Sequence, residues 1–328
     1  MRKNSDFPSL RRKPESRRRP DESREPSQRL GPGFHREPWI PAFAGMTILI
    51  ERAVYKQTLI IRDSLKGNKR MFLEEVAEIK REEIAKRKSL SPLTDWEKLI
   101  PQLPPPRGFI EAISRHAPMA LIAEIKRSSP SAGVIKEDVD LHRIASAYEA
   151  GGACAISVLT EAHFFKGDLS SLARVKERTS LPVLQKDFIL DPFQIYEGRA
   201  LGADAILLIA SLLDRKELKD FVMLTQNLQM VPLVEIHNES DLEKTSTLDL
   251  SLIGINNRNL KTLEVDLRTT LRLRKEIPSG TKVISESGIR SSQDVKLLRE
   301  AGVDGILVGE SLMRSADPTS KIRELLGR

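Results

Sequence analysis

Residues 118–328 repeat one unit, and this repetition predicts a fold of the α/β class, a (β/α)8 TIM barrel. In each unit an apolar, β-rich run of residues is followed by a polar loop and then by a helix-forming segment. The apolar runs are continuous, which is typical of strands buried on both faces of a parallel sheet. Eight units within about 210 residues match the size of such a barrel. A doubly wound sheet is the weaker alternative, because it usually has fewer strands and no G-x-G-x-x-G follows the first strand.

The strands and helices are expected at regular intervals. Strands are predicted near residues 120–126, 153–158, 182–186, 204–209, 231–236, 251–256, 281–286 and 304–308. Helices are predicted near residues 139–150, 168–178, 192–201, 214–228, 239–246, 266–276, 291–301 and 318–327. Gly202 and Gly302 each lie between a predicted helix and the next strand, where glycine favours the end of a helix.

An extra N-terminal helical segment, residues 71–117, is expected before the first strand, so that the barrel domain comprises residues 71–328. Residues 71–88 read MFLEEVAEIKREEIAKRK and form a plausible amphipathic helix with acidic and basic residues four apart. Its rough apolar stripe consists of Leu73, Val76, Ile79 and Ile84. A proline-rich connection follows this helix.

Residues 1–70 are predicted to be a disordered basic extension. They are rich in Arg, Pro and Ser and lack an apolar period up to residue 45. The segment PWIPAFAGMT resembles a peptide encoded by a common bacterial intergenic repeat, so we expect that the natural start is Met71. An organelle transit peptide, disfavoured by the acidic residues, and an RNA- or membrane-binding arm are the alternatives.

The charge of the chain is concentrated in this extension. Residues 1–70 contain 17 Lys or Arg against 8 Asp or Glu, whereas residues 71–328 contain 36 against 38. The barrel is therefore not expected to bind nucleic acid. The single cysteine, Cys154, lies in an apolar run and is expected to be a core residue, and the histidines show no metal-ligand spacing. No apolar run reaches the ~18 residues needed to span a membrane.

Polar residues or glycines lie at the carboxyl ends of six of the eight predicted strands. In LIAEIKRSSPS, Glu124 and Lys126 are two residues apart, so their side chains share one face of a strand that is otherwise apolar. The later strands end in Lys186, Glu235, Asn256 with Arg258, Glu286 with Ser287 and Gly288, and Gly309 with Glu310. All of these converge on one mouth of a barrel, and buried charges are costly unless they are paired or used.

An active site explains these residues together, although each has a structural alternative. Taken alone, Glu124 and Lys126 are explained about as well by a structural ion pair as by a role in catalysis. Lys186 could pair with Glu235, and Asn256 could cap the following loop.

The last two strands are followed by short glycine-containing turns, Ser287-Gly288 and Val308 to Ser311. Backbone N–H groups and a helix N-terminus at these two positions hold a phosphate group in many barrels. The alternative is that both are ordinary turns between a strand and a helix and bind no phosphate. We expect a substrate with a phosphate monoester.

Several motifs resemble those of the indole-3-glycerol phosphate synthase family, which closes the indole ring in tryptophan biosynthesis. They are LIAEIKRSSPSAGVI, SVLTEAHFFKG, VLQKDFILDPFQIYEGRALGADAILLI, VEIHN, IGINNRNL, ISESGI and GILVGESLM. The resemblance runs from Met71 to the C-terminus, and it implies that the leading helix packs over the barrel mouth.

The family's substrate is 1-(2-carboxyphenylamino)-1-deoxyribulose 5-phosphate. The resemblance implies ring closure, decarboxylation and dehydration to indole-3-glycerol phosphate without a metal or organic cofactor. It also implies a cytoplasmic enzyme that is a monomer or a weak oligomer. A phosphoribosylanthranilate isomerase is the nearest alternative, but its chemistry needs a Cys or Asp acid–base pair in place of the two lysines. A protein that binds nucleic acid through its basic extension is the alternative from another class.

The resemblance implies a catalytic role for five residues. Lys186 is expected to protonate the ribulose carbonyl oxygen, and Lys126 to pair with the substrate carboxylate. Glu235 is expected to be the base of the dehydration, while Glu124 and Asn256 orient the lysines and the ribulose hydroxyls. Which lysine protonates at which step stays open.

Substrate contacts follow from the same resemblance. Phosphate contacts are expected at Lys126, Ser129, Ser287, Gly288, Gly309 and the backbone N–H of Glu310. Phe165, Phe188 and Leu207 are expected to form an apolar wall around the anthranilate ring, with core packing as the alternative. Arg258 is expected to reach the ribulose hydroxyls or a carboxylate, and Glu286 and Leu307 are the remaining expected contacts.

Overall fold

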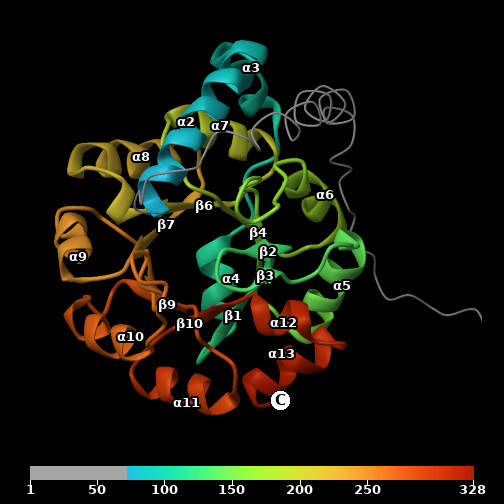
Figure 1. Ribbon diagram of the computed structural model, residues 1–328, viewed down its shortest axis with the longest axis vertical. Coiled ribbons are helices and arrows are strands. Elements are labelled where there is room, and N and C mark those ends of the chain that lie inside the picture. The colour runs from blue at the N-terminus through green and yellow to red at the C-terminus, as the bar shows by residue number, and fades with distance from the viewer. Residues whose placement is uncertain (1–71) are drawn as a thin grey trace, which may run out of the picture. The chain divides into compact units, whose positions relative to one another are not determined.

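The computed structural model of the protein describes residues 72–328 (Figure 1). The predictions about disorder and the start site in residues 1–70 concern residues that lie outside this range. No helix among the described residues is long and apolar enough to cross a membrane.

Eight parallel strands form a closed barrel, which confirms the predicted fold class. The strands are β1 (Ala120–Ile125), β4 (Ala155–Leu159), β5 (Val183–Lys186), β6 (Ala205–Ile209), β7 (Val231–Ile236), β8 (Leu252–Asn256), β9 (Lys282–Glu286) and β10 (Gly305–Val308). Each strand pairs with the next one along the chain, and β1 closes the barrel by pairing with both β4 and β10. A two-stranded antiparallel sheet, β2 (Ser128–Ser129) with β3 (Gly133–Val134), was not predicted, because its strands are too short to show a period.

A helix follows each strand of the barrel, as predicted. These helices are α5 (Leu141–Gly151), α6 (Ser171–Arg178), α7 (Pro192–Ala200), α8 (Arg215–Asn227), α9 (Glu239–Thr245), α10 (Arg268–Leu273), α11 (Ser292–Glu300) and α13 (Pro318–Leu326). Side-chain caps begin all of these helices except α6 and α10, and Asp191, Asp214 and Ser291 each form a capping box. Gly202 and Gly302 have φ values of 91° and 80°, a conformation that glycine adopts without strain where a helix ends.

Some predicted helices are shorter than expected, and several short elements were not predicted. The last predicted turn of α10 is the 3-10 helix η3 (Arg274–Glu276), and α12 (Glu310–Arg314) and η2 (Ala210–Leu212) fill the loops after β10 and β6. These elements are too short to show an apolar period.

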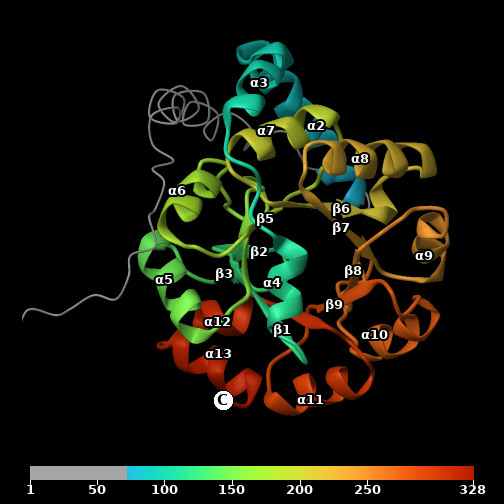
Figure 2. The ribbon, with the colours of Figure 1, turned by 180° about the vertical axis from the view of Figure 1, so that it is seen from behind.

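The N-terminal segment contains α2 (Phe72–Leu90), α3 (Leu93–Leu99), η1 (Ile100–Gln102) and α4 (Phe109–Arg115). In α4, Phe109 and Ile113 belong to the same buried cluster as Ala120 and Ala155, which begin β1 and β4. Helix α4 therefore closes the amino-terminal end of the barrel (Figure 2). Helix α2 packs against α7 (Figure 1), and the ammonium of its Lys80 reaches the turns after β4 and β5.

The barrel interior explains why polar residues gather at one end. Because side chains alternate between the two faces of a strand, residues two apart point into the same interior. Interior apolar residues in five strands are Ile122, Leu184, Leu233, Ile284 and Leu307. Two positions further along the same strands lie Glu124, Lys186, Glu235, Glu286 and Gly309. The pattern therefore places these groups in the last interior layer, at the carboxyl-terminal mouth.

Candidate active site

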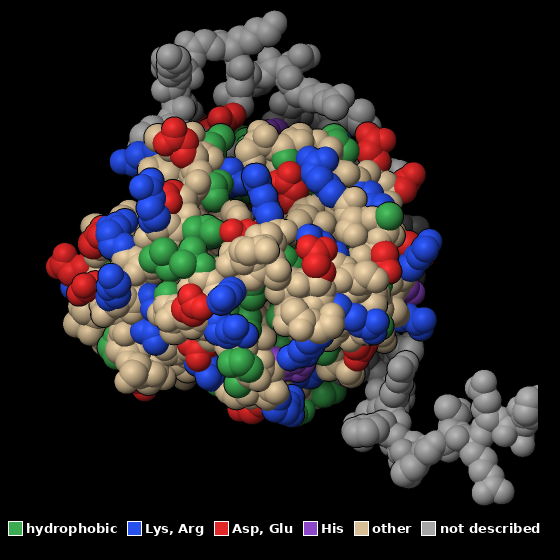
Figure 3. Space-filling model, turned by 90° about the horizontal axis from the view of Figure 1, so that it is seen from below, with side chains coloured by type: hydrophobic (Ala, Val, Ile, Leu, Met, Phe, Trp, Pro, Cys, Tyr) green, Lys and Arg blue, Asp and Glu red, His purple; other side chains and the backbone are tan. Residues whose placement is uncertain are grey.

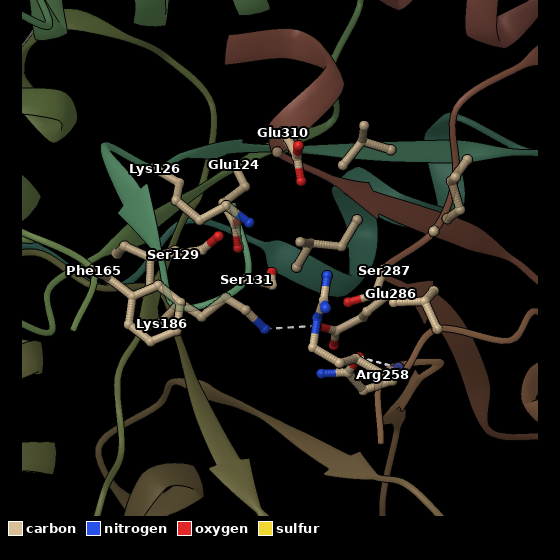
Figure 4. A pocket seen from close by; sticks show the side chains of 18 of the residues that line it. Glu124, Lys126, Ser129, Ser131, Phe165, Lys186, Arg258, Glu286, Ser287 and Glu310 are labelled. Carbon is tan, nitrogen blue, oxygen red and sulfur yellow. Dashed lines mark hydrogen bonds and ion pairs between the residues drawn. The ribbon is translucent and has the colours of Figure 1, made fainter. Parts of the chain in front are cut away.

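The carboxyl-terminal mouth of the barrel opens into a cavity of about 400 Å³. All residues predicted to form the site line this cavity. They are Glu124, Lys126, Ser129, Phe165, Lys186, Phe188, Leu207, Glu235, Asn256, Arg258, Glu286, Ser287, Gly288, Leu307, Gly309 and Glu310. Figure 4 shows several of them facing one another across the cavity. Residues from all eight barrel strands or the loops after them thus meet in one place.

Lys186 lies between two carboxylates, and Figure 4 shows its ammonium directed at one of them, Glu286. Its Nζ is 2.6 Å from Glu286 Oε2 and 3.1 Å from Glu235 Oε2. Burial acts to lower the pKa of Lys186, but Glu286, Glu235 and Glu124 outweigh it, so the pKa lies above its usual value. Lys186 is therefore an ammonium ion at neutral pH and can donate protons into the cavity.

Glu235 is surrounded by donors. Besides Lys186, the His237 ring lies with Nε2 3.2 Å from Glu235 Oε1, and the Asn256 side chain donates to the same carboxylate. Burial acts to raise the pKa of Glu235, but Lys186, His237 and Asn256 hold it below its usual range. The side chain is a carboxylate at neutral pH.

His237 was not among the predicted site residues. Its Nδ1 is 3.5 Å from Asp241 Oδ2 on α9, so the ring lies between two carboxylates. Burial acts to lower the pKa of His237, but Asp241 and Glu235 raise it to about 9. The sequence contains a signal for a role of His237 in the site. His237 follows Glu235 by two residues, the same spacing by which Lys126 follows Glu124.

Glu286 shares the ammonium of Lys186 with Glu235. Burial raises the pKa of Glu286, and the charge of Glu235 adds to the effect, while Lys186 opposes both. Two carboxylates that share one cation release their protons as a pair. The Oε1 atom of Glu286 is buried and has no hydrogen-bond partner within residues 72–328. Gly254 makes room for this carboxylate, because a Cβ atom there would overlap Glu286 Oε1.

Glu124 and Lys126 form an ion pair across 2.6 Å, which is one of the two arrangements predicted for them. Glu124 is buried, while the side chain of Lys126 is 18% exposed and reaches the cavity. Gly309, directly after the neighbouring strand β10, faces Glu124, since a Cβ atom there would overlap Glu124 Oε1. The predicted phosphate contact Gly309 thus also has a structural reason to be glycine.

The turn after β9 is strained. Ser287 and Gly288 have φ values of 66° and 84°, and a Cβ atom on Gly288 would lie 2.6 Å from Val265 Cγ1. A serine in the left-handed region costs free energy and is most often found at functional sites. Beside this turn, the hydroxyl of Ser311 lines the cavity and is buried without a hydrogen-bond partner among the described residues.

The remaining predicted residues form the cavity wall. Phe165 and Phe188 lie with their ring centroids 6.2 Å apart, and Leu207 and Leu307 are buried beside the cavity. The backbone N–H of Arg258 donates to Asn256 Oδ1 across 3.0 Å. Asn256 therefore caps the loop after β8, which was the structural role predicted as an alternative to catalysis.

Within residues 72–328, no group of three or more His, Cys, Asp or Glu side chains is arranged to hold a metal ion. Cys154 is fully buried in the core, and burial raises the pKa of its thiol to about 12. Its predicted role as a core residue is confirmed.

Comparisons with known proteins agree on one family. The family model described as "Indole-3-glycerol phosphate synthase" matches residues 73–325. Two relatives with the same name come from Rippkaea orientalis and Acetivibrio thermocellus. The first is 46% identical over 268 residues, covering 80% of this chain and 92% of the relative. The second is 45% identical over 256 residues, covering 77% of this chain and 98% of the relative.

Solved structures support the fold alone. The crystal structure of 3-hexulose-6-phosphate synthase from Salmonella typhimurium has a TM-score of 0.52 at 15% identity, covering 63% of this chain and 96% of that one. A second structure of a 3-hexulose-6-phosphate synthase has a TM-score of 0.51 at 15% identity, covering 64% of this chain and 99% of the other.

Proposed function

Because the chain belongs to the indole-3-glycerol phosphate synthase family, we propose which residues of its barrel mouth carry out each step of that family's reaction. The enzyme is a carboxy-lyase of tryptophan biosynthesis. It acts on 1-(2-carboxyphenylamino)-1-deoxyribulose 5-phosphate and forms indole-3-glycerol phosphate, carbon dioxide and water. The family predicted from the motifs is confirmed.

Lys186 is the acid of the ring closure. The aromatic carbon that bears the carboxylate attacks the C2 carbonyl of the ribulose chain, and negative charge develops on the carbonyl oxygen. An ammonium ion that donates to this oxygen lowers the barrier. The single observation that carries this assignment is the position of Lys186 Nζ, at the cavity and between two carboxylates that keep it charged.

Lys126 binds the carboxylate of the anthranilate ring. Its ammonium lies at the cavity wall, and Glu124 holds it there across 2.6 Å. Once the ring carbon is tetrahedral, carbon dioxide leaves and the electron pair of the broken bond restores the aromatic system. A fixed ammonium also keeps the ring in the attacking geometry.

Glu235 is the base of the final dehydration. The hydroxyl on the former carbonyl carbon takes a proton from a lysine ammonium and leaves as water, and the methylene carbon next to the ring nitrogen must lose a proton to form the double bond of the indole ring. Glu235 is held as a carboxylate by Lys186, His237 and Asn256, so it can accept this proton at neutral pH. The Oε1 atom of Glu286, which lacks a partner among the described residues, is placed to accept from a ribulose hydroxyl.

The phosphate group lies against the turns after β9 and β10. The strained Ser287-Gly288 turn, the start of α12 and the unpartnered Ser311 hydroxyl support this placement, since phosphate oxygens would accept from each. Lys126 and Ser129 line the same cavity and supply further donors.

Two alternative functions are less well supported. An isomerase that uses a cysteine base would need that cysteine in the cavity, but the only cysteine of the chain, Cys154, is buried in the core and does not line it. Binding of nucleic acid to the barrel would need a basic surface. On the face shown in Figure 3, Lys and Arg side chains are interspersed with Asp and Glu.

The test is turnover of the carboxyphenylamino-deoxyribulose phosphate by the purified full chain, followed by the fluorescence of the indole product. We expect turnover without added metal and after dialysis against a chelator. Absence of turnover with authentic substrate would overturn the residue assignments. We further expect a cytoplasmic enzyme that is a monomer or weak oligomer. Size-exclusion chromatography with light scattering tests the oligomeric state.

A further inference from the structure

Lys80 is a buried lysine on a helix that lies outside the barrel. It is only 1% exposed, and its Nζ is 2.9 Å from Asp187 Oδ1, 2.9 Å from Glu83 Oε2 and 4.0 Å from Glu161 Oε1. Lysine is almost never fully buried unless it is paired. Burial acts to lower the pKa of Lys80, but Asp187, Glu83 and Glu161 together raise it above its usual value, so the side chain is an ammonium ion.

One of its partners, Glu161, shapes the loop that carries Phe165. The Glu161 carboxylate accepts hydrogen bonds from the backbone N–H groups of His163, Phe164 and Phe165 across 2.9, 2.7 and 3.0 Å. These bonds fold the loop after β4 around a single side chain. The position of Phe165 at the cavity wall therefore depends on where Glu161 lies.

The other partner, Asp187, directly follows Lys186. Its Oδ1 accepts from the backbone N–H of Phe188 across 2.8 Å, and its Oδ2 accepts from Thr160 Oγ1 across 2.6 Å. The backbone N–H of Thr160 in turn donates to the carbonyl oxygen of Lys186 across 3.1 Å. The turns after β4 and β5 are thus joined to each other at Lys186 and at the residue that follows it.

We infer that Lys80 is a positioning residue for the ring-closing reaction, which it serves by pairing with Asp187 and Glu161 and so holding Lys186, Phe188 and Phe165 in place. This inference rests on the proposed roles of Lys186 and Phe165. Lys80 does not line the cavity and acts only through its two partners. It makes part of α2 a component of the site, although α2 contributes no side chain to the cavity.

Removal of the ammonium has a defined physical consequence. Glu161 and Asp187 would remain as two buried carboxylates beside each other without their nearest cation. Such a pair must take up a proton or move apart. Moving apart would displace the loop with Phe165 and the turn that carries Lys186, and a small misplacement of reacting groups costs about 100-fold in rate.

The other charged groups near Lys80 cannot replace it. Glu83 on α2 is a further anion, and Arg87 is engaged by Glu83 and by Glu197 of α7 at 2.9 and 3.5 Å. Glu197 is itself buried, and burial raises its pKa to about 7 although Arg87 opposes this. Asp187 raises and Lys80 lowers the pKa of Glu197, so Lys80→Met also raises that pKa, whereas a variant that removes both charges removes both influences.

The first test is Lys80→Met, which keeps the length of the aliphatic stem and removes the charge. At pH 8 we expect kcat/KM to fall about 10- to 100-fold. The loss should shrink toward pH 6, because protonation of one of the two carboxylates restores the net charge that they have together with Lys80 in the wild type. Lys86→Met on the exposed face of the same helix is the matched control and should match the wild type at both pH values.

The second test is rescue by Lys80→Met combined with Asp187→Asn. The asparagine Oδ1 can still accept from Phe188, and its Nδ2 can donate to Thr160 Oγ1, so both hydrogen bonds survive without the negative charge. The double variant should recover kcat/KM to within about threefold of Asp187→Asn alone, with a wild-type pH profile. A purely structural role of Lys80 predicts neither the pH shift nor this rescue.

Every outcome decides the inference. Unchanged kcat/KM and pH profile in folded Lys80→Met would overturn it while leaving the proposed function intact, whereas an inactive wild type would overturn the proposed function itself. If Lys80→Met does not fold, as judged by near-UV circular dichroism, the double variant decides. A folded and active double variant supports the positioning role, and an inactive or unfolded one overturns it.

Discussion

At the scale of single residues, the site depends on how one ammonium ion is shared between carboxylates. Lys186 lies within 3.1 Å of both Glu235 and Glu286, and the three side chains come from strands far apart in the sequence. Glu235 has two further donors, His237 and Asn256, and so is the more acidic of the two carboxyl groups. The arrangement keeps Lys186 as an ammonium and Glu235 as a carboxylate at neutral pH, as the proposed acid and base require.

Lys186→Met should leave a folded protein with kcat reduced at least about 100-fold, because the carbonyl oxygen loses its proton donor. The rate is measured by indole fluorescence and the fold by circular dichroism. Lys296→Met, at an exposed position on α11, is the matched control and should retain wild-type kcat. Retention of wild-type turnover by folded Lys186→Met would contradict the assignment of the acid.

His237→Asn should change stability in a pH-dependent way. The pKa of His237 rises from 6.5 to about 9 in the folded protein, because Asp241 and Glu235 outweigh burial. A raised pKa stabilises the fold fully below pH 6.5 and ceases to do so as the pH rises through 9. The variant should lose up to about 3 kcal/mol of unfolding free energy at pH 6 and little above pH 9.

Urea unfolding of wild type and variant at several pH values measures this difference, and His142→Asn on the exposed face of α5 is the control. A pH-independent difference would contradict the prediction. In activity, His237→Asn removes a cation beside Glu235, so the pKa of Glu235 should rise. The acid limb of the kcat/KM profile should therefore move to higher pH.

Gly254→Ala tests whether glycine is needed beside Glu286. The added Cβ atom would overlap Glu286 Oε1, so the carboxylate must move away from its place beside Lys186. We expect a loss of about 1–3 kcal/mol in unfolding free energy and a clear fall in kcat. Gly280→Ala, where a Cβ atom meets nothing within 4 Å, should change neither quantity, and equal behaviour of the two variants would contradict this account.

At the scale of elements, the alternation of side chains along each strand carries the site. Ile122, Leu184 and Leu233 face the barrel interior, so the charged residues two positions later face its mouth. This relation needs only the sequence and the period of a strand. The loops after the strands are different, because their conformation depends on contacts such as those of Glu161, which no period reveals.

Helix α2 is attached to the barrel by apolar contacts as well as by Lys80. Ile84 is 3% exposed and belongs to a buried cluster with Trp96, Phe193 and Ala200. Ile84→Ala should lower the unfolding free energy by about 2–4 kcal/mol, because it leaves a cavity between α2 and α7. Thermal unfolding measures the loss. The exposed residue Leu90 of the same helix offers the control Leu90→Ala, which should have little effect.

At the scale of the whole molecule, the barrel is closed at one end and open at the other. Helix α4 covers the amino-terminal end, where Asp204 accepts from the backbone N–H groups of Arg107 and Val183 and pairs with Lys176. This polar cluster lies away from the cavity, at the end of a barrel that contributes to stability and not to chemistry.

A chain that begins at Met71 should fold and turn over substrate as the full chain does, because the family match begins at residue 73. Kinetics and thermal unfolding of both forms measure this. Loss of folding on truncation would show that residues 1–70 are structural. Mass spectrometry of the native N-terminus separately tests the predicted start at Met71, and peptides from residues 1–60 would contradict it.

The sequence by itself determined the number of the barrel strands and their order along the chain, the face of each polar residue and the family. It could do so because the period of a strand is local and because the motifs around Glu124, Lys186 and Glu286 are contiguous. Only the tertiary structure decided which groups meet. Lys186 pairs with Glu235 and Glu286, which are 49 and 100 residues away in the sequence. Lys80 reaches Asp187 from helix α2, for which the sequence pattern predicted only an amphipathic helix. Such pairings depend on closure of the barrel and on the docking of α2, which bring distant segments together and have no local signature in the chain.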